Sequence, residues 1–413
     1  MIWSIPAPDP FFVGLFHGAH YNALGVRDSF HPSGKTVMNR RSVSRACGAI
    51  PRWAAVALAA AAAAGPLRAA DPASASAGPE PRVAVGKCAS PDGTLLARES
   101  AGKDWRTTAH DGGVFSRDVL LALPGVRAAV DTEPRAVNLT LFGSVPQLSP
   151  SPVLQSEVVL HDSRGYDLDV TPRAGRIILT NTKEKGPAKV WLRLPGFAWQ
   201  LTLLEPGTRV GMEVYGRWPI GVPFARDPKP WEEPTKVVLL LMSKGKAYLE
   251  TESHAYDLSA PPGPAFMTWD SVAGEAAGPD SIRALPPWAD PNVSVPAEGK
   301  SVEEAVEEYQ SRLKKTNSAE AALQELLEAA AKEKDKPRAA MLREAAVLGL
   351  GALDDTARVA ELLADPQSAD TRDAAVVALR MWIGAYPGRD LELYRQLQDQ
   401  IGYTDRQAET VLD

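Results

Sequence analysis

The stretch GRIILTNTKEKGPAKVWLRLPGFAWQLTLLEPGTRV, Gly175–Val210, holds short apolar runs separated by glycine and proline. In Val190–Leu194 every second residue is apolar, so Trp191 and Arg193 fall together on the opposite face of a strand. Runs this short, bounded by turn residues, are typical of β-strands. The stretch therefore predicts consecutive strands with no helix between them.

Similar runs recur between residues 104 and 285. Outside the quoted stretch they are Val119–Leu123, Val137–Leu141, Val158–Leu160, Val237–Met242, Ala247–Leu249 and Tyr256–Leu258. The chain also has 35 prolines in 413 residues, which suits strands and turns better than a mainly helical protein. Because no crossover helix separates the runs, residues 104–285 predict an all-β sandwich, a barrel or a β-helix-like domain rather than a parallel α/β sheet.

Two units of this segment share a pattern of a glycine, a basic residue, a strand and a proline-glycine turn. These units are Gly175–Val210 and Gly245–Phe266. On this pattern, residues 175–266 resemble the FecR-like domain. That resemblance implies an all-β periplasmic module that in its best-known members senses a signal and is coupled to a sigma factor. Regulatory members also carry a cytoplasmic helical segment and a membrane span, which this sequence does not show. The resemblance thus implies the fold more than the regulatory activity.

Residues 301–413 have the apolar period of helices. The expected helices after the first are 319–331, 338–350, 355–363, 371–385, 390–401 and 405–412. This part has 22 acidic and 14 basic residues, so it forms an acidic unit of its own.

Within this part, Ala345–Gly351 and Thr371–Leu379 carry an arginine near the start of the second helix and an Ala-Ala-x-x-Ala-Leu face. Residues 339–382 resemble a HEAT-like repeat, which implies a stacked helical scaffold for protein contacts. The alternative is an ordinary helical bundle.

Residues 38–69 are typical of a secretory signal peptide. Four arginines precede the apolar run Trp53–Ala64, and a small-residue cleavage site follows near Ala69. The twelve-residue run is shorter than the roughly 20 residues of a membrane anchor, the alternative interpretation. We expect translation to start at Met38, with residues 1–37 a non-native or disordered extension. The mature protein is then exported to the periplasm or cell envelope, with no membrane span left after cleavage.

Two linkers complete the expected organisation. Residues 70–103 are a low-complexity linker, and the proline-rich residues 286–300 join the β part to the helical part. The two parts differ in composition and charge, so we expect them to fold separately.

No motif for catalysis, cofactor binding or metal binding stands out. The three histidines beyond the signal are not at metal-ligand spacing, and the adjacent triad types His161, Asp162 and Ser163 would point to opposite faces of a strand. The net charge of −6 argues against nucleic-acid binding. We therefore predict no catalytic residue, metal or cofactor, and no nucleic-acid partner.

Tryptophans supply the candidate ligand-binding residues. Trp191 and Arg193 share an outward strand face, and Trp218 and Trp231 flank the proline-rich loop Pro219–Pro234. The alternative is that these tryptophans cap the ends of a β core.

The sequence predicts an exported, non-catalytic binding or sensing protein of the cell envelope, with a FecR-like β module and a helical protein-contact scaffold. Its partner would be another envelope protein or a glycan. The alternatives are a carbohydrate-binding or adhesive β-sandwich protein and, less favoured, a hydrolase with an unrecognised site.

Overall fold

The computed structural model describes residues 82–100, 102, 104–143, 153–219, 221–290, 300–316, 318–364 and 368–412. The predicted extension, signal peptide and cleavage site near Ala69 lie outside these residues. Within the described ranges, no helix combines the length and apolar character needed to cross a bilayer.

The β part consists of two sheets that share one long strand, β9 (Leu168–Asn181). Sheet A has the order β4 (Gly113–Phe115), β1 (Ala84–Cys88), β6 (Arg127–Thr132), β7 (Val137–Phe142), β9, β12 (Arg209–Arg217), β13 (Thr235–Lys244), β16 (Pro264–Asp270) and β17 (Ala276–Ser281). Sheet B has the order β3 (Arg106–Thr108), β2 (Leu95–Glu99), β5 (Asp118–Ala122), β8 (Ser156–Leu160), β9, β10 (Ala188–Leu194), β11 (Phe197–Leu203), β14 (Lys246–Glu250) and β15 (Ala255–Ser259).

Every described ladder is antiparallel except the one between β9 and β10. The predicted all-β domain is therefore confirmed. Of the three expected forms, the sandwich matches, because a barrel is a closed sheet and a β-helix is built from parallel ladders, whereas these two sheets are open and largely antiparallel.

Strand β9 passes from one sheet to the other at Gly175. Its first half pairs with β8 and β10 in sheet B, and its second half pairs with β7 and β12 in sheet A. Gly175 has a φ of 97°, and a Cβ there would lie 2.3 Å from the Cα of Ser156. Only glycine fits this position, because both the left-handed backbone and the close approach exclude a side chain.

The main core lies between the two sheets. Alternation along each strand sends one set of side chains inward, as the sequence predicts for Val190–Leu194, whose residues 190 and 192 are fully buried. Trp199 on β11 is the largest of the fully buried side chains. The sheets thus share one apolar layer to which strands from both halves of the β part contribute.

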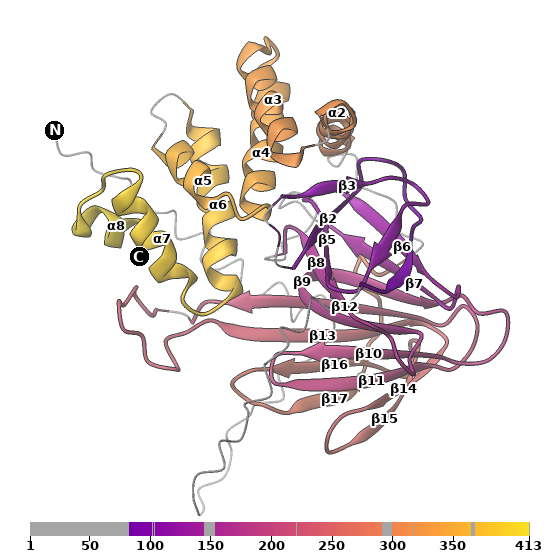
Figure 1. The fold of residues 1–413 in the computed structure, drawn as a ribbon. Helices are drawn as coiled ribbons and strands as arrows, with labels where there is room; N and C mark the ends of the chain where they lie inside the picture. The colour runs from indigo at the N-terminus through magenta and orange to yellow at the C-terminus, as the bar shows by residue number, and fades with distance from the viewer. Residues whose placement is uncertain are drawn as a thin grey trace, which may run out of the picture. The chain divides into compact units, whose positions relative to one another are not determined.

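The helical part follows, and the described residues contain seven helices (Figure 1). They are α2 (Lys300–Thr316), α3 (Ala319–Lys332), α4 (Lys336–Ala352), α5 (Thr356–Leu363), α6 (Ala369–Ala385), α7 (Arg389–Asp399) and α8 (Asp405–Leu412). An all-α region after the β domain is confirmed.

Sheet B is buried on both faces where it meets these helices. On β5, Leu120 and Ala122 face the core between the sheets, whereas Val119 and Leu121 join a second cluster with helical side chains such as Leu350. Leu96 and Trp105 belong to the same cluster. The two parts share this apolar layer, which argues against the separate folding that the sequence led us to expect.

Parts of both predicted linkers are ordered. Strands β1 and β2 lie inside residues 70–103, so the described portion of that linker belongs to the two sheets. In the second linker, Ala289 is buried and the Trp288 ring lies over Gly211 of β12, where a Cβ would come within 2.9 Å of the ring. Residues 291–299 lie outside the described ranges.

Candidate functional site

The outer face of sheet B carries the first candidate site. Trp191 and Arg193 project from β10 on the side opposite the core, as predicted, and Trp191 is half-buried while Arg193 is exposed. The registers place Gln200 of β11 directly opposite Trp191, and Glu250 of β14 opposite Gln200. We call the set Tyr166, Asp169, Trp191, Arg193, Gln200 and Glu250 the aromatic face.

Two rings and an amide form the centre of the aromatic face. The Tyr166 ring lies 5.1 Å from the Trp191 ring at an angle of 41° between their planes. The Tyr166 hydroxyl donates to Gln200 Oε1 at 3.1 Å, and Gln200 Nε2 donates to Glu250 Oε2 at 2.7 Å. These contacts hold the rings and the amide in fixed positions on an open sheet.

Arg193 is held beside the rings by Asp169. Its Nε and one terminal nitrogen each donate to a different Asp169 oxygen at 2.7 Å. This bidentate pair raises the pKa of Arg193, and the Asp169 side chain is nearly buried while Arg193 is about half exposed. The guanidinium is therefore fixed in direction but open to solvent.

The other polar groups near this face are engaged with one another. His161 Nε2 lies 2.8 Å from Thr171 Oγ1, and burial lowers the pKa of this histidine. Asp162 and Asp167 form ion pairs with Arg164 and Lys183, each below 3 Å. His161 and Asp162 thus have separate partners, and no cluster suited to a metal ion occurs in the described ranges.

Trp218 and Trp231 lie apart from the aromatic face, on the loop between β12 and β13 of sheet A. The Trp218 indole donates to the Val222 carbonyl oxygen at 3.0 Å. Trp231 is 69% exposed, with Lys229 Nζ 5.3 Å from its ring centre. The four predicted binding residues therefore lie in two separate places, and the structure surrounds only Trp191 and Arg193 with further aromatic and polar side chains.

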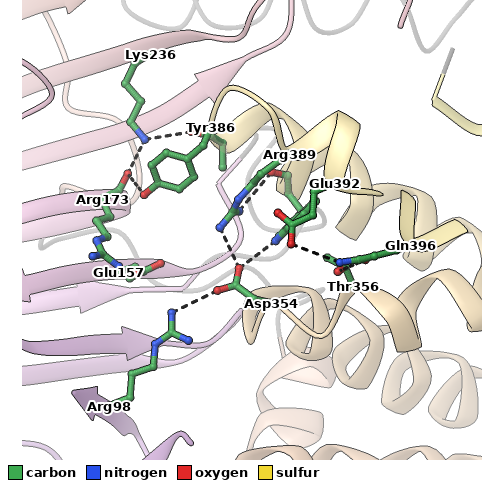
Figure 2. A network of polar contacts seen from close by, with 12 residues as sticks. Arg98, Glu157, Arg173, Lys236, Asp354, Thr356, Tyr386, Arg389, Glu392 and Gln396 are labelled. Atoms are coloured by element: carbon green, nitrogen blue, oxygen red, sulfur yellow. Dashed lines mark hydrogen bonds and ion pairs between the residues drawn. The ribbon is translucent and has the colours of Figure 1, made fainter. Parts of the chain in front are cut away.

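A second polar cluster joins the sheets to the helices (Figure 2). Lys236 of β13 is nearly buried, and its Nζ donates to the Arg173 carbonyl at 2.6 Å and to the Ala385 carbonyl at 3.5 Å. Burial, together with the nearby Arg389 and Arg173, lowers the pKa of Lys236 to about 8. The Tyr386 hydroxyl donates to the same Arg173 carbonyl at 3.4 Å.

Asp354, just beyond α4, is the acidic centre of this cluster. It accepts from Arg389 at 3.0 Å, from the Trp382 indole at 3.0 Å and from Arg98 of β2 at 3.4 Å. Its φ of 64° is left-handed, a conformation that aspartate and asparagine tolerate better than most residues. We call Arg98, Arg173, Lys236, Asp354, Tyr386 and Arg389 the polar seam.

Helix polarity explains why the polar seam is rich in cations. Lys236 meets the last carbonyl of α6, and Arg389 donates to the Trp382 carbonyl one turn before that helix ends. Carbonyl groups at a helix C-terminus carry partial negative charge and lack intrahelical partners. Lys236 and Arg389 therefore supply donors to the carbonyls at the end of α6, where this helix meets the sheets.

Sequence reasoning missed most of these partners. Alternation in β11 and β14 is a sequence signal from which the outward positions of Gln200 and Glu250 could be predicted. Only the strand register shows that they lie beside Trp191. No sequence signal marked Lys236 or Asp354.

Comparisons with known proteins give no match: no family model, no curated protein and no solved structure matches the chain.

Proposed function

We propose that this protein is an exported cell-envelope protein that binds a carbohydrate chain on the aromatic face. The observation that carries the binding role is the Tyr166–Trp191 ring pair, in which a hydrogen bond to Gln200 holds Tyr166. A carboxylate and a guanidinium flank this pair. A sugar ring has an apolar C–H face that packs on an aromatic ring, and its hydroxyls need donors and acceptors at the ring edge.

The pattern of charges suits a neutral or weakly charged sugar. Glu250 can accept hydrogen bonds from hydroxyls, and the Gln200 amide can donate or accept them. The positive charge of Arg193 is already compensated by Asp169. An ion pair of this kind offers directed donors without adding net charge to the face. We therefore favour hydroxyl recognition over recognition of a polyanion.

Two finer elements belong to the same proposal. Residues 38–69 would direct export, and the FecR-like pattern at 175–266 fits a periplasmic binding module. The paired helices α3–α4 and α5–α6, with Arg358 of α5 donating to Gln324 of α3, fit a HEAT-like stack. One side of this stack packs on sheet B, so a further protein partner would use the remaining helical surface.

The test is binding of the full-length protein to an array of soluble oligosaccharides, followed by titration of the best one. We expect Trp191→Ala to weaken binding at least about tenfold, which corresponds to about 1.4 kcal/mol. Trp231→Ala is the matched control, since it removes an exposed tryptophan from the loop between β12 and β13 and leaves the aromatic face intact. Equal loss in both variants, or no sugar binding by the wild type, contradicts the proposal.

A further inference from the structure

A second row of outward side chains runs beside the aromatic face on sheet B. In the strand registers, Lys189 of β10 lies opposite Thr202 of β11, and Thr202 lies opposite Tyr248 of β14. Asp257 of β15 lies in turn opposite Tyr248. We call this set the second row. Lys189 and Asp257 are exposed and carry opposite charges, so the second row adds no net charge to this side of the sheet.

Tyr248 places a further aromatic ring on the outer side of sheet B. Its chain neighbours Ala247 and Leu249 are buried in the core between the sheets, so alternation along β14 turns Tyr248 outward. The side chain is partly exposed, and among the described residues it has no hydrogen-bond or ring partner. The ring is therefore open to a ligand.

Strand β11 separates Tyr248 from Trp191. Gln200 lies directly opposite both Trp191 and Glu250, and Tyr248 precedes Glu250 by two residues on the same face of β14. At the usual spacing of strands and of residues along a strand, the Cα atoms of Trp191 and Tyr248 are about 12 Å apart. Because one sugar ring covers one aromatic side chain, a ligand that contacts both rings has to be a chain of several sugars.

The surface between the two rings is polar. Gln200 and Thr202 both project outward from β11, because the residues that alternate with them, such as Leu201, are buried. The Thr202 hydroxyl has no hydrogen-bond partner among the described residues, and the exposed Asp257 carboxylate lies beside Tyr248. Amide, hydroxyl and carboxylate groups all exchange hydrogen bonds with sugar hydroxyls. A path from Trp191 to Tyr248 thus has an aromatic ring at each end and polar groups along it.

We propose that the aromatic face and the second row together bind a straight, neutral oligosaccharide that crosses β10, β11 and β14, with one sugar on Trp191 and another on Tyr248. This inference rests on the proposed function and adds the length and shape of the chain as determinants of specificity. Sugars joined through equatorial bonds form an extended chain that can follow these strands across an open sheet. An axial bond at each linkage makes the chain curve away from such a surface.

The test measures, by isothermal titration calorimetry, the affinity of the full-length protein for cello-oligosaccharides of increasing length. Malto-oligosaccharides of the same lengths are the matched ligands, because they contain the same sugar joined through axial bonds. We expect the affinity for the cello series to rise at least about fivefold once the chain reaches both rings, and the malto series to show no such rise. An equal rise in both series overturns the proposal.

Tyr248→Ala separates the second ring from the first. We expect this variant to lose the rise with chain length and to keep the wild-type affinity for the shortest cello-oligosaccharide that binds. Tyr248→Phe keeps the ring and should keep the rise, and Trp231→Ala, which lies outside both sets of residues, should behave like the wild type. An equal loss at every length in Tyr248→Ala would mean a merely structural tyrosine and would overturn the proposal.

The length series also distinguishes this inference from the proposed function. Cello-oligosaccharide binding that Trp191→Ala weakens but that does not depend on chain length contradicts only the inference. Absence of binding at every length, together with no binding on the oligosaccharide array, contradicts both. Binding on the array to other sugars alone contradicts the straight chain and leaves the aromatic face as a sugar site.

Discussion

The Lys236 ammonium lies 4.5 Å from the centre of the Tyr386 ring, with Lys236 on β13 and Tyr386 directly after α6. The same ring lies 4.7 Å from the Arg389 guanidinium, so two cations share one aromatic side chain. Burial raises the pKa of Tyr386, so the ring stays neutral and no phenolate offsets these charges. The polar seam therefore holds a lysine whose positive charge is only partly compensated, which lowers the free energy of unfolding while this lysine is protonated.

We predict that Lys236 makes stability rise with pH between about 8 and 10.5. Its folded pKa of about 8 is below the ordinary value of 10.5, so over this interval the unfolded chain holds a proton that the folded chain has lost. The charged lysine costs stability below pH 8, and that cost is relieved as pH rises. At about 1.4 kcal/mol per pH unit, the relief amounts to about 3 kcal/mol.

Urea unfolding of wild type and Lys236→Met from pH 7 to 10.5 measures this effect. We expect the free energy of unfolding of the wild type to increase relative to that of Lys236→Met as pH rises. The control Lys185→Met, at an exposed position, should follow the wild-type profile. Parallel profiles for wild type and Lys236→Met would refute the prediction.

Asp354 gives a second prediction, because three donors from β2, α6 and α7 converge on its carboxylate. Asp354→Ala leaves Arg389 and the Trp382 indole without their acceptor. It also places alanine at a left-handed φ, which alanine tolerates less well than aspartate. Asp354→Asn keeps a side-chain oxygen and tolerates that φ. We expect the alanine variant to unfold at a clearly lower urea concentration than the asparagine variant, and the reverse order would contradict this account.

The sequence predicted those features that depend on local patterns. The expected helix 319–331 is observed as Ala319–Lys332, because its apolar period is regular and Ser318 caps it by accepting from the Ala321 backbone N–H. The outward position of Trp191 followed from alternation alone.

Features that depend on distant contacts could not be predicted in this way. The Lys236–Ala385 hydrogen bond joins residues 149 apart in sequence, and the neighbours of Trp191 depend on how β10, β11 and β14 align. A charged residue such as Lys236 gives no sequence sign that it will be buried, because lysine is usually exposed. The polar seam was therefore visible only in the structure.

Shared packing gives a third prediction. Leu121 of β5 is fully buried in the cluster that also contains helical residues, so Leu121→Ala should lower the free energy of unfolding by about 2–4 kcal/mol. We expect strands and helices to lose protection from hydrogen exchange together, and calorimetry to show one transition. Two separate transitions, with only one moved by the substitution, would restore the view of two independent parts.

The close approach of Gly216 at the end of β12 to Gly384 in α6 gives the last prediction. A Cβ on Gly216 would lie 1.7 Å from the Gly384 carbonyl oxygen, whereas a Cβ on Gly384 would lie 3.6 Å from the Gly216 oxygen, an ordinary contact. Gly216→Ala must therefore push the strand and helix apart, and we expect it to cost at least about 1–3 kcal/mol.

Gly384→Ala is the matched control, since alanine also favours a helix over glycine by roughly 0.5–1 kcal/mol. Urea midpoints should fall for the first variant and stay or rise for the second. Similar midpoints for both would mean that strand and helix do not meet at these glycines.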